Sequence, residues 1–444
     1  MSSKNVHMAN AFDPSSIDLI PSEVRAMVDR RNRVLAPSYR LFYQEPVEII
    51  RGSGVRLFDS QGRSYLDAYN NVPAVGHANP HVTQAVCEQM SRLNTHTRYV
   101  TMPIIEYSER LLGLFPDEIQ QVIFACTGSE AVDLALRIAK YETGKEGIIV
   151  TRNAYHGTTT EAATISPSLG PHRPVANWVR YVDAPDTSAE GSDAGPLLAA
   201  RVAEAIAELE ADGVGFAALI VDSIFSSDGL QTDPAGFLEP VARVVHAAGG
   251  LYIADEVQPG FGRTGESWWG FARHGIVPDL VVLGKPMGNG LPISAVLGRP
   301  EVLDRFGKDM RYFNTFGGNS VSIAAANAVL DVIEDQDLLG NAKRVGKNLG
   351  SGLREIAQNY PMLSAVRGCG LFYGVDVTDA SGTGRADQAG AVRIVNGLRS
   401  RRVLISSSGK DENVLKIRPP LVFSGSDLQE FLESFRAVME DLHG

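Results

Sequence analysis

Between residues 120 and 300 the chain alternates short apolar runs with longer amphipathic segments. A strand that is apolar along its whole length is typical of a parallel sheet with both faces covered by helices. The pattern therefore predicts an α/β fold, with a mostly parallel central sheet and helices on both faces. The expected strands span residues 121–126, 146–155, 216–224, 251–257, 279–285 and 292–299.

The pattern changes after residue 320. A long helix is expected over 320–339, followed by alternating stretches at 363–377 and 414–421 and a last helix over 427–442. This mixture is typical of a smaller α+β domain. We therefore predict three parts, namely an N-terminal segment (1–60) that packs with the small domain, a large domain (61–320) and a C-terminal small domain (321–444).

Charge and cysteine content exclude several classes of function. The chain has 41 Lys and Arg against 52 Asp and Glu, a net charge of −11, whereas a generic nucleic-acid binder needs a basic surface. A few arginines could still bind a small anionic substrate. The three cysteines are far apart, so we expect neither a disulfide framework nor a metal site.

The apolar runs are also too short for a membrane. No run approaches the ~18 apolar residues that a membrane helix needs. The first residues lack the apolar core of a signal peptide. We therefore expect a cytoplasmic protein with no membrane partner.

Two of the expected strands end in residues suited to a phosphorylated, planar ligand. The run 121–126 leads into Gly128 and Ser129, which open a helix and could offer backbone N–H groups to a phosphate. The same residues also suit an ordinary helix start. The next strand ends in Tyr155, His156 and Gly157, where the tyrosine could stack on a flat ring or simply fill the core.

Two further strands end in an acid and in a lysine. Asp255 ends the run 251–255, and Lys285 follows the run 280–284. Each of them alone reads as an exposed strand end. Together with the phosphate seat and the aromatic residue they match one cofactor, pyridoxal phosphate, which needs a lysine for its Schiff base and a carboxylate facing its pyridinium nitrogen.

Five motifs then identify a family. TGSEAVDLALRIAK, NAYHG, GGLYIADEVQPGFGRTG, LGKPMGNGLP and NTFGGN occur in this order, and with them residues 35–440 resemble the class III aminotransferases of fold type I. The resemblance implies that Lys285 forms the Schiff base and Asp255 pairs with the pyridinium nitrogen. The other implied cofactor contacts are Gln258 near the phenolic oxygen, Tyr155 or His156 on the ring face, Gly128 and Ser129 on the phosphate, and Thr315 on the phosphate of the partner subunit's cofactor.

The resemblance also implies an assembly and one departure. Family members place the site at a dimer interface, so a homodimer, or a tetramer made of two dimers, is expected. Asp222 stands where many members have glutamate, one methylene longer. An acid is retained, but any contact that the longer side chain makes near the cofactor is in doubt.

The reaction remains open between two classes. YNNVPAVGHANP, MSRLNTHTRYV, GKPMGNG and RRVLISSSGKDENVLKIRPPLVF are most similar to the branch of ethanolamine-phosphate phospho-lyases and alanine–glyoxylate aminotransferases. A lyase would remove phosphate from O-phosphoethanolamine or a similar phosphorylated amine, giving acetaldehyde, ammonia and phosphate. An aminotransferase would pass an amino group to pyruvate, glyoxylate or another oxo acid. A non-catalytic relative is disfavoured, because Lys285 and Asp255 are both present.

Candidate substrate contacts follow from the need to hold an anion. Arg418, in KIRPP, could hold either a carboxylate or a phosphate. Arg40 is the second candidate, and Asn71 and Lys410 are the further ones. Each of the four, taken singly, could instead be a surface or structural residue.

Overall fold

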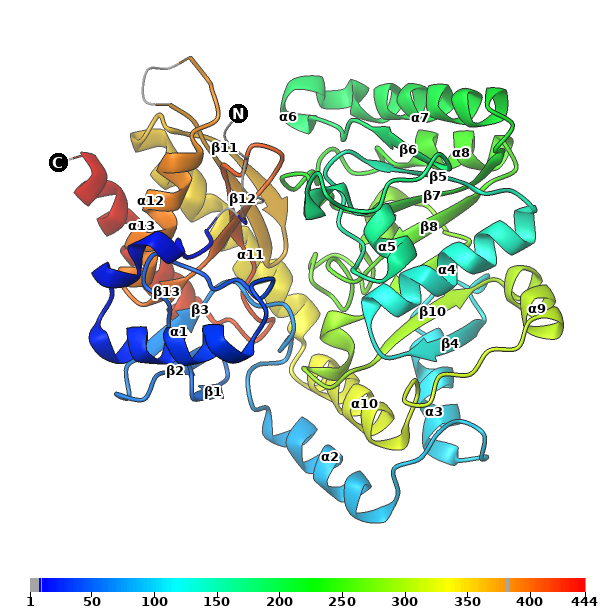
Figure 1. Ribbon diagram of the computed structural model, residues 1–444, viewed down its shortest axis with the longest axis horizontal. Coiled ribbons are helices and arrows are strands. Elements are labelled where there is room, and N and C mark those ends of the chain that lie inside the picture. Colours follow the sequence, from blue (N-terminus) through cyan, green and yellow to red (C-terminus); the bar gives the residue numbers. More distant parts are fainter. Residues whose placement is uncertain (1–7, 9, 380–382, 444) are drawn as a thin grey trace.

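The computed structural model describes residues 8, 10–379 and 383–443, which form two parts that lie side by side (Figure 1). The larger part, drawn mainly in cyan to yellow, holds the central part of the chain. The smaller part combines the N-terminal segment, in blue, with the C-terminal segment, in orange and red.

The larger part is built on a seven-stranded sheet of order β4-β10-β9-β8-β7-β5-β6. Strands β6, β5, β7, β8 and β9 run parallel, whereas β10 is antiparallel to both of its neighbours. The strands span Gln121–Ala125 (β4), Gly147–Thr151 (β5), Val179–Val182 (β6), Phe216–Asp222 (β7), Leu251–Asp255 (β8), Leu280–Leu283 (β9) and Ser294–Gly298 (β10).

Both faces of this sheet are buried, which explains the apolar runs. On one face Ile148, Ile220 and Val282 pack against α4 (Gly128–Thr143). Their neighbours in sequence point to the other face, where Leu219 and Val281 belong to a core that includes α7 (Ala194–Ala211) and α8 (Glu239–Ala247). Because side chains alternate along a strand, a strand covered on both sides needs apolar residues at every position.

Other helices of the larger part flank this core. They are α2 (Pro80–Arg92), α3 (Met102–Leu112), α5 (Thr160–Thr164), α6 (Thr187–Glu190), α9 (Pro300–Asp309) and α10 (Ser320–Asp335). Short 3₁₀ turns cover Pro167–Leu169 (η2), Gly191–Asp193 (η3), Gly270–His274 (η4) and Lys285–Gly288 (η5).

The smaller part joins the two ends of the chain through two four-stranded sheets. The first has the order β1-β2-β3-β13, in which β3 (Ser64–Asp67) runs parallel to β13 (Val403–Leu404). The second has the order β11-β12-β15-β14. The remaining elements are η1 (Pro14–Leu19), α1 (Ser22–Val34), β1 (Arg51–Ser53), β2 (Arg56–Phe58), α11 (Leu338–Asn359), β11 (Leu363–Cys369), β12 (Phe372–Val377), α12 (Gln388–Ser400), β14 (Ser406–Ser408), β15 (Val414–Ile417) and α13 (Gly425–His443).

The predicted fold class is confirmed, with a mostly parallel sheet between helices and a separate small α+β part. The pairing of β3 with β13 ties the N-terminal strands to the C-terminal segment as far as Asp67. Among the described residues, no helix has the length and apolar character needed to cross a bilayer. In an open parallel sheet, ligands bind beyond the carboxyl ends of the strands, which directs attention to the residues after β5, β7, β8 and β9.

Candidate functional site

A cavity lies where β7, β8 and β9 end. Residues from separate strand ends converge on it, because parallel neighbours finish at the same edge of the sheet. Asp222 and Asp255, for example, are register partners at the ends of β7 and β8. The lining consists of Gly128, Ser129, Tyr155, His156, Gly157, Asp222, Asp255, Val257, Gln258 and Lys285.

Lys285 begins the turn η5, two residues after β9. Its side chain is accessible to solvent that enters the cavity. The protein around it nevertheless lowers its pKa through burial, and the charge of Arg418 lowers it further. Asp255 and Asp222 oppose this shift. A lysine in such surroundings is more readily a free amine, the form that attacks a carbonyl or accepts a proton.

Asp255 is fixed by a histidine and by its own backbone. Its Oδ2 lies 2.7 Å from Nδ1 of His156, and its Oδ1 accepts a hydrogen bond of 3.1 Å from the Val257 N–H. Both side chains are buried. The other ring nitrogen of His156, Nε2, is buried and has no hydrogen-bond partner among the described residues. His156 therefore lies behind the carboxylate and orients it.

Asp222 is held in a loop that follows β7. Its carboxylate accepts hydrogen bonds from the Ile224 N–H at 3.0 Å, the Ser226 N–H at 3.1 Å and the Ser226 hydroxyl. Burial raises the pKa of Asp222, and the nearby charge of Asp255 raises it further. The short side chain thus lines the cavity while its carboxylate is hydrogen-bonded within its own loop.

Gln258 connects this loop to an arginine of the small part. Its amide nitrogen donates to the Ser226 hydroxyl, and its Oε1 accepts from Nη1 of Arg418. Arg418 is 5% exposed, and its Nε donates to the Tyr69 carbonyl at 3.1 Å. Burial lowers its pKa. The arginine predicted for the substrate anion is therefore placed next to the predicted cofactor residues.

The start of α4 forms another wall of the cavity. Thr127 caps the helix, and Glu130 accepts from the N–H groups of Cys126 and Thr127 in a capping box. The N–H groups of Gly128 and Ser129 come next in this first turn, and no acceptor among the described residues takes them. Free N–H groups at a positive helix end suit a phosphate.

Gly157 lies directly against this helix start. Its φ is +145°, and a Cβ on it would come 2.5 Å from Ser129 Oγ and 2.8 Å from Ser129 Cα. Ser129 Oγ also accepts from the Thr158 N–H at 3.0 Å. The glycine of NAYHG thus allows the loop after β5 to fix the position of the first turn of α4.

The ring of Tyr155 faces the lysine across the cavity. Its centroid lies 5.9 Å from Lys285 Nζ, and the residue is 37% exposed. Val257 lines the cavity from the loop after β8. Sequence reasoning missed Val257 and Ser226, since an apolar or small residue in a loop carries no chemical signal of its own.

Five predicted residues lie outside the lining of this cavity. Arg418 reaches it only through Gln258, and Lys410 is exposed between β14 and β15. Asn71 is buried and bonds to the Gln258 carbonyl at 3.2 Å and to Arg263 Nη2 at 2.7 Å, so it supports the site from behind. Arg40 is exposed in the N-terminal segment. Thr315 is exposed in the loop between α9 and α10.

The residues present fit pyridoxal phosphate. Lys285 supplies a free amine, Asp255 a fixed carboxylate for a ring nitrogen, and the start of α4 a seat for the phosphate. The described residues hold no group of three or more His, Cys, Asp and Glu side chains arranged for a metal ion.

Comparison with known proteins identifies the family. The family model described as aminotransferase class-III matches residues 41–439. The chain therefore belongs to the class III aminotransferases, which are pyridoxal-phosphate enzymes.

The relatives carry both activities within the family. An alanine–glyoxylate aminotransferase 2-like protein of Drosophila melanogaster is 36% identical, over 97% of this chain and 91% of its own length. An ethanolamine-phosphate phospho-lyase homologue of Caenorhabditis elegans is 33% identical, over 93% of both chains. Among solved structures, an Arthrobacter phospholyase in complex with phosphoethanolamine matches with a TM-score of 0.90 and 43% identity, covering 93% of this chain and 99% of its own.

Proposed function

We propose that this chain is a pyridoxal-phosphate-dependent phospho-lyase that acts on O-phosphoethanolamine or a similar phosphorylated amine. With water, O-phosphoethanolamine would give acetaldehyde, ammonia and phosphate. The proposal goes beyond the family, because class III members carry out several reactions on one fold.

One observation carries the proposal. Arg418 is buried beside the cofactor residues, and within the described part of the chain its guanidinium donates to two neutral oxygens, those of Tyr69 and Gln258. Asp67 and Asp222 act on it from farther away, without an ion pair. A buried cation without an acidic partner is costly unless an anion joins it. An anionic group on the substrate would supply that partner, and the similarity to a phospholyase that binds phosphoethanolamine makes phosphate the first choice.

The cavity residues have separate roles in this reaction. Bound pyridoxal phosphate supplies an electron sink for the carbon next to the substrate nitrogen. Lys285, whose pKa is lowered by burial, takes the proton from that carbon as a general base. Asp255, oriented by His156, keeps a proton on the ring nitrogen. The C–O bond on the neighbouring carbon then breaks, and phosphate leaves with the electron pair toward Arg418.

Phosphate release without an oxo acid is the deciding measurement. Purified holoenzyme should release phosphate and acetaldehyde from O-phosphoethanolamine alone. Lys285→Ala should abolish this release and the visible absorbance of the bound cofactor. Lys347→Ala is the matched control, because Lys347 is exposed on α11. A wild-type enzyme that releases no phosphate would refute the lyase proposal.

An aminotransferase is the alternative, favoured by the similarity to the alanine–glyoxylate aminotransferase 2-like protein. The same Arg418 could hold a substrate carboxylate. In that case the enzyme would convert pyruvate or glyoxylate to the amino acid at the expense of an amine, and O-phosphoethanolamine would stay intact.

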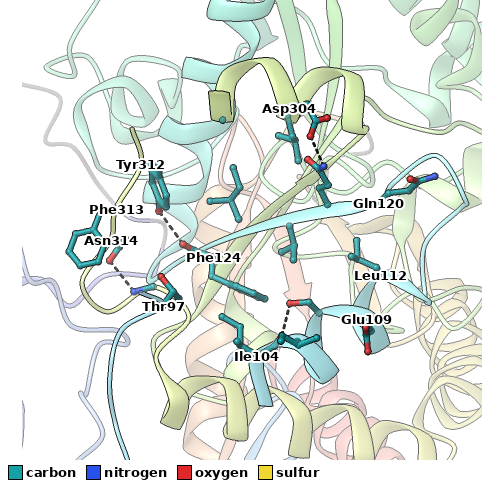
Figure 2. A pocket seen from close by; sticks show the side chains of 18 of the residues that line it. Thr97, Ile104, Glu109, Leu112, Gln120, Phe124, Asp304, Tyr312, Phe313 and Asn314 are labelled. Carbon is teal, nitrogen blue, oxygen red and sulfur yellow. Dashed lines mark hydrogen bonds between the residues drawn. The ribbon is translucent and has the colours of Figure 1, made fainter. Parts of the chain in front are cut away.

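We further propose a homodimer in which Thr315 reaches the partner's cofactor. A second cavity, of about 710 Å³, lies between α3, β4, α9 and the segment that carries Tyr312, Phe313 and Asn314 (Figure 2). Exposed apolar side chains occur in the same loops, with Val100 92% and Phe316 69% exposed. A second copy of the chain would cover this surface and bring Thr315 to a cofactor that its own chain does not hold.

A further inference from the structure

A second basic side chain, that of Lys416, lies half-buried next to Arg418 on the small part. Lys416 lies in β15, and Arg418 directly follows the strand. Because residues two apart on an extended chain point to the same side, the two side chains share a face. Phe372 of β12 lies on that face as well. The Lys416 Nζ and the Arg418 Cζ are each 5.4 Å from the centroid of its ring.

Lys416 reaches across to the loop of the large part. Its Nζ donates to the Ser226 carbonyl at 3.3 Å. Ser226 is the residue that also binds Asp222 and Gln258, and Gln258 binds Arg418. Lys416 and Arg418 do not themselves line the cavity, but both contact residues beside it, Lys416 through Ser226 and Arg418 through Gln258.

The positive charge at this place has little compensation. Among the described residues, no carboxylate oxygen lies within the 4.0 Å ion-pair distance of Lys416 or Arg418. From farther away, Asp67 acts on Arg418 and Asp222 acts on both cations. The carboxylate oxygens of Asp222 are occupied by Ile224 and Ser226. Burial lowers the pKa of Lys416 well below its usual value and the charge of Arg418 lowers it further, so a bound anion would favour the protonated form of Lys416.

We propose that Lys416 and Arg418 together bind a dianionic group of the substrate, and that Lys416 selects a phosphate over a carboxylate. The inference rests on the proposed function, since it names the residues that would hold the phosphate of a phosphorylated amine. One arginine suffices for a monoanionic carboxylate. A second, half-buried cation beside it stabilises the second negative charge of a phosphate.

A purely structural role for Lys416 predicts something different. Its bond to Ser226 could simply join the small part to the large part. Removing it would then lower stability and weaken every ligand alike. The Coulomb energy between a cation and an anion instead scales with the anion's charge. An anion-binding lysine therefore contributes about twice as much binding free energy for a dianion as for a monoanion.

The test measures binding of inorganic phosphate, sulfate and acetate to the holoenzyme by calorimetry. Lys416→Gln removes the charge but keeps a donor for Ser226, and Lys416→Met removes both. Lys416→Arg keeps the charge, and Lys347→Met is the exposed control. We expect Lys416→Gln to raise the dissociation constants of phosphate and sulfate by about tenfold or more and that of acetate by about threefold. Lys416→Arg should restore most of the loss.

Kinetics give a second readout. With O-phosphoethanolamine, Lys416→Gln should raise KM by a similar factor and change kcat less. The proposal would be overturned if Lys416→Gln lost the same factor of affinity for phosphate and for acetate, or if its affinity for phosphate were unchanged. If one variant fails to load cofactor, the other charge-free variant gives the same comparison.

These results are distinguishable from a failure of the proposed function. If the wild-type enzyme binds phosphate through Lys416 but releases none from O-phosphoethanolamine, the lyase proposal fails and the anion site stands. If the wild-type enzyme is a lyase but its affinity for phosphate does not depend on Lys416, the lyase proposal is supported and the proposed anion site is refuted.

Discussion

Replacing Gly157 with alanine should weaken cofactor binding through the start of α4. The new Cβ would lie 2.8 Å from Ser129 Cα and 2.5 Å from Ser129 Oγ. Carbon atoms in contact prefer about 3.5 Å, so the Ser129 backbone would have to retreat by about 0.7 Å. The φ of +145° adds strain for any residue with a side chain.

That displacement sets the size of the effect. A hydrogen bond of ~2.9 Å from the Ser129 N–H to the cofactor phosphate would lengthen to ~3.6 Å, beyond the range of a hydrogen bond. Hydrogen bonds to charged groups contribute about 1.5–3 kcal/mol. Losing one should therefore raise the dissociation constant for pyridoxal phosphate about 10- to 150-fold. Crowding in a well-packed site should also cost about 1–3 kcal/mol of stability.

The assay is an absorbance titration of the apoprotein with pyridoxal phosphate, paired with thermal unfolding of the holoprotein. Gly144→Ala is the matched control at the other end of α4. Gly144 also has a positive φ, +68°, but a Cβ on it meets nothing within 4 Å. The Gly144→Ala variant should lose only about 1 kcal/mol of stability, and its affinity for pyridoxal phosphate should be unchanged. If Gly157→Ala binds cofactor within twofold of wild type, the tight contact with Ser129 does not position the phosphate seat.

Three further expectations concern stability and assembly. Burial raises the pKa of Asp228 from 3.8 to about 7, so it contributes stability that is complete below pH 4 and is lost as the pH rises to 7, about 4 kcal/mol in all. When the free energy of unfolding is measured at several pH values, the stability of Asp228→Asn relative to wild type should increase from pH 4 to pH 7. A difference in stability that stays constant with pH would contradict this. Asn71→Ala should cost about 1.5–3 kcal/mol, because buried Arg263 loses an acceptor, whereas a normal melting temperature with a raised KM would make Asn71 a substrate contact. After subunit exchange, inactive Lys285→Ala and impaired Thr315→Ala proteins should together regain about a quarter of wild-type activity, since half of the mixed dimers' sites are intact. No gain on mixing would exclude a shared site.

The sequence predicted the large-domain side of the site because that side follows strand ends. Asp255 and Lys285 stand out as polar residues that end apolar runs, and the runs themselves are explained by a sheet buried on both faces. The antiparallel direction of β10 also follows from the sequence, through the length of the connection before it. Only residues 284–293 separate β9 from β10, and a parallel crossover needs about a dozen residues or more.

Lys416 could not be predicted in the same way. It occupies a polar position in an alternating strand, where a lysine ordinarily faces solvent. Its burial depends on the loop at Ser226, 190 residues earlier in the chain. The support that Asn71 gives to Gln258 and Arg263 likewise depends on tertiary contacts almost two hundred residues apart, which no local pattern records.

The two parts of the molecule divide the chemistry between them. The ends of β8 and β9 and the start of α4 present the groups that suit the cofactor, and β15 presents the cations that suit a substrate anion. A change at residue 416 or 418 could therefore alter which anion binds without moving Lys285 or Asp255. If the proposed anion site is correct, the small part would hold the leaving group or carboxylate and the large part the cofactor, which would allow the substrate to change while the cofactor residues stay in place. This division also implies that substrate class should follow the small-part strand, so an aminotransferase of this family given the KIRPP lysine should gain affinity for phosphate more than for acetate.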